Sequence, residues 1–146
     1  MGGRGASLNG KAKNTATNKA IEITDAQAKI LSKYGASPLG RNKFAVEGFR
    51  SKQSFNNHWK DHKNQYPNFT QEQYKARALN LIESSVGKGI LGHVDKDGIL
   101  TRYDVKENDF AKGKPSKGIY TMFKPDDGIE YYKKMRRIDI ERGGYG

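Results

Sequence analysis

The fold is decided by residues 90–105, which read ILGHVDKDGILTRYDV. Two apolar runs flank Asp97-Gly98, and an Asp-Gly pair between such runs is typical of a β-hairpin. We therefore expect strands at residues 90–94 and 99–105. Upstream of this stretch the apolar residues repeat with a helical period, so the chain changes here from helices to a sheet.

Two more short strands are expected downstream, at residues 109–111 and 119–123, because glycine and proline separate the apolar runs there. A turn at residues 124–128 follows. Residues 129–141 fit either a strand or a short helix, and the spacing of their apolar side chains favours the helix. Together with the hairpin, the two downstream strands predict a small antiparallel sheet of about four strands.

Three helices are expected upstream of the hairpin, and two of them begin at capping boxes, in which side chains satisfy free backbone N–H groups. Thr24 and Gln27 form the first box, at the start of a helix over residues 25–34. Thr70 and Gln73 form the second. The helix after the second box carries an apolar stripe made of Tyr74, Ala78, Leu81 and Ile82. Helices followed by a small sheet indicate an α+β domain.

The composition indicates a small basic protein that binds a polyanion. The 146 residues carry 27 Lys and Arg against 16 Asp and Glu, which gives a net charge of +11. Such a charge attracts nucleic acid, and we favour this interpretation over the alternative that the charge only aids solubility. The absence of cysteine excludes disulfides, thiolate metal sites and cysteine nucleophiles. We expect no membrane span and no secretory signal, since no run is apolar enough for either.

The chain is expected to divide into an arm and one domain. Residues 1–20 contain four basic and no acidic side chains and few apolar ones, and we interpret them as a flexible basic arm. Residues 21–146 then form a single α+β domain. Its helical part extends to about residue 87, and its sheet part begins at about residue 88.

Two of the three histidines lie one helical turn apart in the helix expected over residues 51–65. His58 and His62 share one arc of that helix with Phe55 and Trp59. Imidazoles titrate near neutral pH, so the pair can supply the general acid and base of metal-free RNA cleavage. Two other interpretations stay open, in which the rings pack in the core or bind a metal such as zinc. Trp59 stands where an H-E-x-x-H motif needs glutamate, and we assign no metal and no cofactor.

Other basic and aromatic side chains are candidates for contacts to nucleic acid, although core packing or a solvated surface explains them at least as well. They are Lys60, Tyr103, Lys112, Lys114, Tyr132 and Arg136. Strand alternation places Thr121 and Phe123 on one face of the last strand, and Met122 and Lys124 on the other.

Five segments recur in the same order in one family of proteins. They are HWKDH at residues 58–62, FTQEQYKARA at 69–78, TRYD at 101–104, NDFA at 108–111 and IYTMFKP at 119–125. Through them the chain resembles the barnase–EndoU–colicin–RelE group of ribonucleases, in its phage-associated and polymorphic-toxin branch. The resemblance covers roughly residues 55–132.

The resemblance implies N-terminal helices and a four-stranded antiparallel sheet that bears the active site. It implies metal-independent cleavage of RNA, with tRNA as a candidate substrate, by attack of the 2′-OH, which leaves a 2′,3′-cyclic phosphate. His58 and His62 would be the general acid and base, Arg102 and Lys124 would hold the phosphate, and Thr121 would bond a phosphate oxygen. A toxin or phage protein that acts in the bacterial cytoplasm, with an acidic immunity or antitoxin protein as partner, is also implied.

The chain departs from the family in two places. Asp61 stands where the family usually has Lys, and Gln65-Tyr66 stands where many members have Glu-Phe. Asp61 either removes positive charge near the phosphate or raises the pKa of a neighbouring histidine. The alternatives to a metal-independent endoribonuclease are a basic nucleic-acid-binding phage accessory protein without catalysis and a metal-dependent nuclease that uses both histidines.

Overall fold

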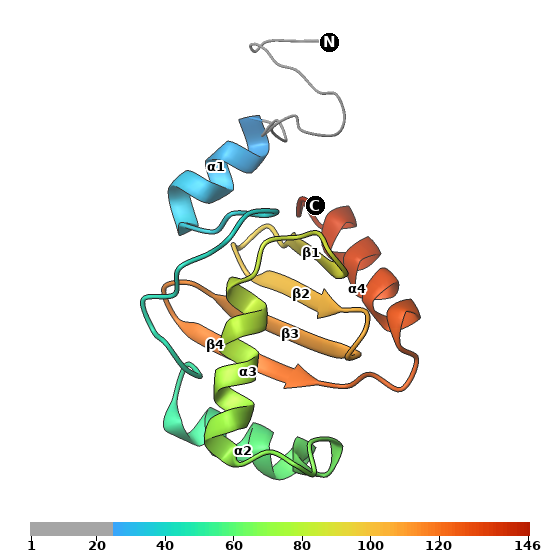
Figure 1. The fold of residues 1–146 in the computed structure, drawn as a ribbon. Coiled ribbons are helices and arrows are strands. Elements are labelled where there is room, and N and C mark those ends of the chain that lie inside the picture. The colour runs from blue at the N-terminus through green and yellow to red at the C-terminus, as the bar shows by residue number, and fades with distance from the viewer. Residues whose placement is uncertain (1–24) are drawn as a thin grey trace.

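The computed structural model describes residues 25–146, so the arm expected at residues 1–20 and the capping residue Thr24 lie outside the described residues. Within this range four helices surround a four-stranded antiparallel sheet, which confirms the predicted α+β class (Figure 1). In chain order the elements are α1 (Asp25–Tyr34), α2 (Lys52–His62), a 3₁₀ turn (Lys63–Gln65), α3 (Gln71–Glu83), β1 (Ile90–Val94), β2 (Leu100–Asp104), β3 (Asp109–Lys114), β4 (Gly118–Phe123) and α4 (Ile129–Glu141).

The sheet is a meander in which each strand pairs with the next, in the order β1-β2-β3-β4. The predicted Asp-Gly turn joins the first two strands, and Gly98 takes a φ of 82°, which glycine adopts without strain. Cross-strand partners share a face, so Arg102, Ala111 and Met122 lie on one side of the sheet. Helix α3 runs across this face (Figure 1).

The main core lies between α3 and this face of the sheet. The four residues predicted as the stripe of α3 are all fully buried there, with Leu100, Ile119 and Met122 among the strand residues that they meet. The predicted capping box is present, because Thr70 accepts from the Gln73 backbone and the Gln73 side chain accepts from Thr70. Local signals therefore begin the helix at the right residue, and burial of its stripe holds it on the sheet.

A second, smaller core lies on the opposite face, which is covered by α4. Tyr103 and Phe110 from the strands pack there against Tyr132, whose ring stacks on Tyr103 at 5.7 Å between centroids. His93 ties α4 to β1, because its Nε2 lies 2.7 Å from a carboxylate oxygen of Asp139. The helix that we favoured for residues 129–141 is confirmed, and its aromatic side chains cover the sheet.

Strand β3 is longer than predicted, because it includes Lys112, Gly113 and Lys114. This lysine- and glycine-rich stretch is typical of a loop, but here it pairs with both neighbouring strands. Gly113 lies against the ring of Phe44 and the side chain of Ile82, where an added Cβ would come within 3.1 and 3.2 Å. Tertiary contacts therefore override the local signal.

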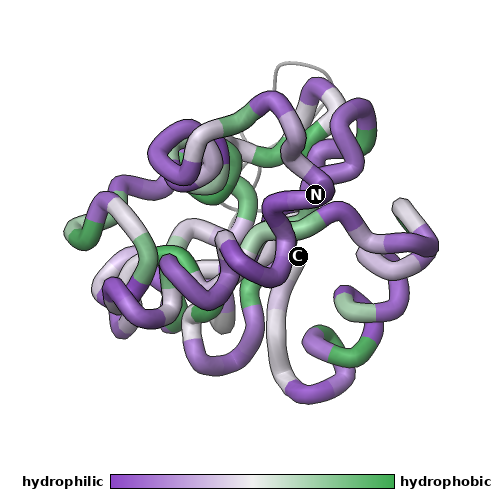
Figure 2. The backbone as a smooth tube through the Cα atoms, turned by 90° about the horizontal axis from the view of Figure 1, so that it is seen from below, coloured by the Kyte–Doolittle hydropathy of each residue, from purple (hydrophilic) through white to green (hydrophobic). Residues whose placement is uncertain are grey.

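Hydrophobic residues are scattered along the chain in short segments. Viewed from below, most of the tube is hydrophilic and the hydrophobic parts are separated from one another (Figure 2). Among residues 25–146, no helix is both long and apolar enough to cross a bilayer.

Candidate active site

Helix α2 is held at the β4 edge of the sheet by the segment of residues 48–50, which runs beside that strand. Phe49 forms a parallel bridge with Ile119, and the Arg50 N–H donates to the Ile119 carbonyl at 3.1 Å. Gly118 permits this approach, since a Cβ there would lie 2.5 Å from the Gly48 carbonyl oxygen. Ser51 then caps α2 by accepting from the Ser54 N–H at 3.0 Å. The start of α2 is thereby fixed next to β4.

Four rings stack in a ladder from this edge segment, along α2, to the end of β4. Phe49 stacks on His58 at 5.8 Å, His58 on His62 at 5.8 Å, and His62 on Phe123 at 5.4 Å. The histidines are therefore held between two phenylalanines. Phe55 and Trp59, which share their arc, pack against the main core.

Both imidazoles are partly exposed, so neither is a fully buried core residue. The predicted site residue Thr121 lies next to them, with its Oγ1 3.2 Å from Nδ1 of His58. This contact orients the His58 ring, and no residue from 25 to 146 hydrogen-bonds its Nε2. His62 makes no side-chain hydrogen bond to any residue between 25 and 146, so both of its nitrogens can meet a ligand. The predicted grouping of His58, His62 and Thr121 is present in the structure.

The surroundings favour the neutral form of both rings. Burial lowers the pKa of His58 most, and the neighbouring His62 and Arg50 lower it further. Burial also lowers the pKa of His62. The Asp61 carboxylate opposes this by raising the pKa of each ring, as the sequence suggested for one neighbour. Two stacked imidazoles do not easily carry a proton each, so as the pH falls the pair takes up its first proton more readily than its second.

A row of polar side chains crosses the sheet and ends at His58. His93, Thr101, Lys112 and Thr121 are successive cross-strand partners on β1 to β4. Such partners have Cβ atoms about 5 Å apart, so Lys112 is the basic residue next to Thr121 in the sheet. Lys112 is partly exposed and in no ion pair with any described residue. Of the predicted nucleic-acid contacts, it is the one that the sheet places beside Thr121.

A bulge in β4 lies next to this row. Lys112 pairs with Thr121, whereas Gly113 pairs with Ile119, so Tyr120 is an extra residue on β4. The Arg50 guanidinium lies over the Tyr120 ring, 4.2 Å from its centroid. Arg50 was not among the site residues predicted from the sequence. Its position directly before the N-cap residue Ser51 could have marked Arg50 as a candidate. Only the pairing of residues 48–50 with β4, however, shows where its side chain lies.

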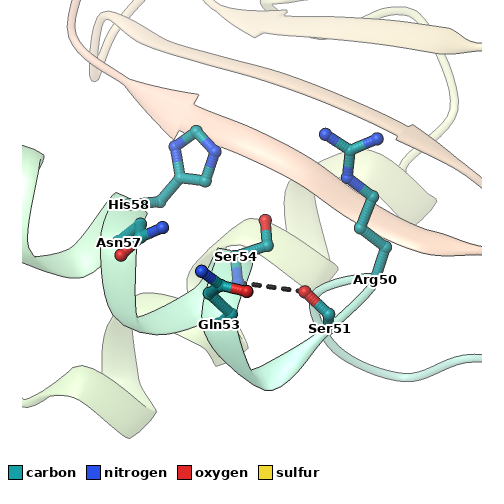
Figure 3. Close-up of a pocket in the computed structure, with 6 residues that line it drawn as sticks. All are labelled: Arg50, Ser51, Gln53, Ser54, Asn57 and His58. Carbon is teal, nitrogen blue, oxygen red and sulfur yellow. Dashed lines mark hydrogen bonds between the residues drawn. The ribbon is translucent and has the colours of Figure 1, made fainter.

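A pocket of about 410 Å³ opens beside His58. Figure 3 shows its lining residues, which come from the edge segment and the first two turns of α2. They are Arg50, Ser51, Gln53, Ser54, Asn57 and His58. The lining includes one permanent cation and no carboxylate.

The expected role of Arg102 is wrong. Its side chain is fully buried on the α3 face, where the guanidinium donates to the carbonyls of Ser84, Thr101, Ser37 and Gly40 at 2.9 to 3.2 Å. Burial lowers the pKa of this guanidinium to about 10. Its donors are occupied and out of reach of solvent, so Arg102 cannot hold a phosphate.

Lys124 does not join the histidines either. It lies on the opposite face from Thr121, as strand alternation predicts, and pairs with Asp109 at 2.9 Å. Arg77 binds the same carboxylate at 3.0 Å, and the Lys124 ammonium lies over the Tyr66 ring. The phosphate-holding role expected for Lys124 is therefore corrected to that of an ion-pair partner.

The remaining predicted contacts are dispersed. Tyr103 and Tyr132 are 2% and 3% exposed, so these two cannot stack on a base, and the expectation for them is wrong. Lys114 lies over the Tyr34 ring near α1, and Arg136 donates to the Gly146 carbonyl. Lys60 is exposed on α2. Neither Lys114 nor Arg136 lines the pocket beside His58.

No group of three or more His, Asp or Glu side chains within residues 25–146 is arranged to hold a metal ion. His58 and His62 therefore have no third protein ligand of this kind in the described part of the chain. Comparisons with known proteins add no assignment, because neither a family model nor a curated protein matches the sequence.

Proposed function

We propose that the protein is a metal-independent endoribonuclease that uses His58 and His62 as its acid–base pair. One observation carries this proposal: two partly exposed imidazoles stack at 5.8 Å, and one is oriented by Thr121. The net charge of +11 and the resemblance of the ordered segments to ribonucleases also support it. Packing in the core explains the pair less well, because ring nitrogens without hydrogen-bond partners add no stability when they are buried.

The reaction needs two proton transfers and a cation. One imidazole removes the proton of the ribose 2′-OH, whose oxygen attacks phosphorus. The other imidazole donates a proton to the departing 5′-oxygen, which leaves a 2′,3′-cyclic phosphate and a 5′-hydroxyl. Lys112, in register with Thr121, would stabilise the negative charge that grows on the phosphate oxygens. It replaces Arg102 and Lys124 in that role.

Cleavage of total RNA and of tRNA by the purified protein in excess EDTA tests this proposal. We expect the wild type to cut RNA, and His58→Asn and His62→Asn each to lose about 10²- to 10⁴-fold in rate. Asn64→Ala, at an exposed position in the next turn, is the matched control and should keep full activity. Circular dichroism should show the same fold in all three variants.

Three results would contradict the proposal. RNA that stays intact with the wild type would favour a binding protein without catalysis. Cleavage that EDTA abolishes and zinc or nickel restores would favour a metal-dependent nuclease. Equal cleavage by the two histidine variants and the wild type would exclude these residues from the chemistry.

The same proposal includes a site of action and a partner. A ribonuclease that resembles phage and toxin proteins would act in the bacterial cytoplasm, and its host would need an inhibitor. A basic surface associates fastest with an acidic protein, so we expect an acidic immunity or antitoxin protein. Affinity capture from the native host should recover it, with capture that is weaker at high salt.

A further inference from the structure

The pocket that contains Arg50 lies on the far side of His58 from His62. Along α2 its lining residues extend from the N-cap Ser51 to His58, and His62 follows one turn later. His58 is thus shared between the pocket and the histidine pair. A chain molecule with its reacting group at the pair can place its next unit in the pocket.

The chemistry of the pocket suits an anion. Arg50 is exposed, and its guanidinium makes no ion pair or hydrogen bond to any residue from 25 to 146. The Tyr120 ring contacts the face of the guanidinium, 4.2 Å away, which leaves the N–H groups at its edge free. Free, planar N–H donors of this kind match the oxygens of a phosphate.

A second observation points to the same ligand. Ser54 belongs to the pocket lining, and its hydroxyl oxygen is buried and has no hydrogen-bond partner among residues 25–146. A buried hydroxyl without a partner is costly, and rotation of the Ser54 side chain toward the pocket would let it donate to an acceptor oxygen of a ligand there. Figure 3 shows Arg50, Ser54 and His58 directed to the same side of α2.

We propose that this pocket binds the phosphate next to the scissile one in a single RNA strand. The inference rests on the proposed function, because the cleaved phosphodiester is placed at His58 and His62. It assigns Arg50 to substrate binding beyond the reacting group. The substrate is then at least a trinucleotide, and Arg50 contributes through the second phosphate.

Kinetics on short substrates test this assignment. A dinucleotide has only the scissile phosphate, whereas trinucleotides extended at either end have one more. We expect the wild type to prefer one of the two trinucleotides by about tenfold in kcat/KM, as a charge-assisted contact would give. Arg50→Ala should reduce that preference to near one, and Arg50→Lys should keep part of it. Arg41→Ala, an exposed arginine in the loop before α2, should keep the full preference.

A binding measurement separates this inference from the proposed function. The 2′-deoxy trinucleotide cannot be cleaved, and its binding should shift the Arg50 side-chain NMR signal and be weakened by Arg50→Ala. If that binding occurs but no RNA is cut, the phosphate site stands and the proposed ribonuclease fails. If RNA is cut but Arg50→Ala leaves the trinucleotide preference unchanged, the phosphate site is overturned and an acidic protein becomes the better occupant.

Discussion

The Arg102 guanidinium donates to carbonyls at the end of α3 and in the loop before α2, so it joins two segments that are distant in sequence. Gly92, on the neighbouring strand, makes room for it, since a Cβ there would lie 2.5 Å from an Arg102 Nη1 atom. Helix ends leave carbonyls without partners, and a buried cation with several donors can satisfy them. The charge of Arg102 is therefore structural.

Removal of this guanidinium should destabilise the protein strongly. Arg102→Met fills much of the volume but leaves buried carbonyls unsatisfied, so we expect a loss of about 3 kcal/mol in the free energy of unfolding. Arg102→Lys should recover only part of the loss, because it has fewer donors and a different geometry. Urea denaturation measures the change, with Arg41→Ala as the exposed control. A stable Arg102→Met protein that fails only to bind RNA would restore the phosphate-binding role.

If the histidine pair is catalytic as proposed, Asp61 influences the pH range in which it works. Its carboxylate raises the pKa of both His58 and His62, although burial keeps each below the ordinary histidine value. The proposed reaction needs one neutral and one protonated ring, so kcat/KM should follow a bell-shaped curve with its maximum on the acid side of pH 6.5.

Asp61→Asn should move this curve toward lower pH. Without the carboxylate both pKa values fall, so the protonated ring is lost at a lower pH as the solution is made more alkaline. Activity near neutral pH should therefore decrease, while activity at the new maximum is kept. A pH–rate profile of the two proteins measures the shift. An unchanged profile would mean that other groups control the reaction.

Among the elements, α4 is attached to β1 partly through a buried histidine. His93 is fully buried, with Asp139 at one ring nitrogen and the Tyr132 hydroxyl 3.3 Å from the other. Burial lowers the pKa of His93, and the nearby cations of Lys112 and Arg136 lower it further, although Asp139 opposes them. The unfolded chain therefore binds a proton more readily than the folded one.

This difference makes the attachment of α4 sensitive to acid. The stability that neutral His93 contributes is complete above the unfolded pKa of about 6.5 and is lost as the pH falls through the folded value. We expect the free energy of unfolding to decrease from pH 8 to pH 5, and His93→Gln to reduce that slope while it lowers stability at pH 8. Urea denaturation at several pH values measures this. An identical slope in both proteins would remove His93 from the acid response.

Local patterns were enough to predict most elements. The capping box at Thr70, the Asp-Gly turn and the apolar stripe of α3 all concern residues near one another in sequence, and each is present. Residues 112–114 could not be assigned to β3 in the same way, because their pairing depends on strands formed elsewhere. Long-range contacts decide such segments.

The candidate site was predictable only in part, for a related reason. The one-turn spacing of His58 and His62 and the alternation of β4 are local, and both placed side chains correctly. Alternation separates the faces of β2, but it does not say what covers each face. Helix α3 covers Arg102 on one face, and α4 covers Tyr103 on the other. Both side chains were therefore expected in solvent and are buried.

Over the whole molecule, the proposed function gives separable tasks to the positive charge and to the histidine pair. A charge of +11 would attract any nucleic acid, because phosphates release bound counterions when they meet Lys and Arg. The proposed cleavage reaction, in contrast, needs a ribose 2′-OH next to His58 and His62. A protein of the proposed kind should therefore bind both RNA and DNA but cut only RNA.

Salt dependence separates the two tasks. We expect the logarithm of the RNA binding constant to fall linearly with the logarithm of salt concentration, with a slope that reports the number of phosphates contacted. His58→Asn should keep the wild-type slope for non-cleavable RNA while it loses cleavage, whereas Arg50→Ala should reduce the slope by about one. Fluorescence anisotropy over a range of salt concentrations, paired with the cleavage assay, measures both. A neutral imidazole carries no charge for a phosphate to neutralise. A changed slope in His58→Asn would therefore mean that the His58 ring is protonated in the complex and contributes to electrostatic binding.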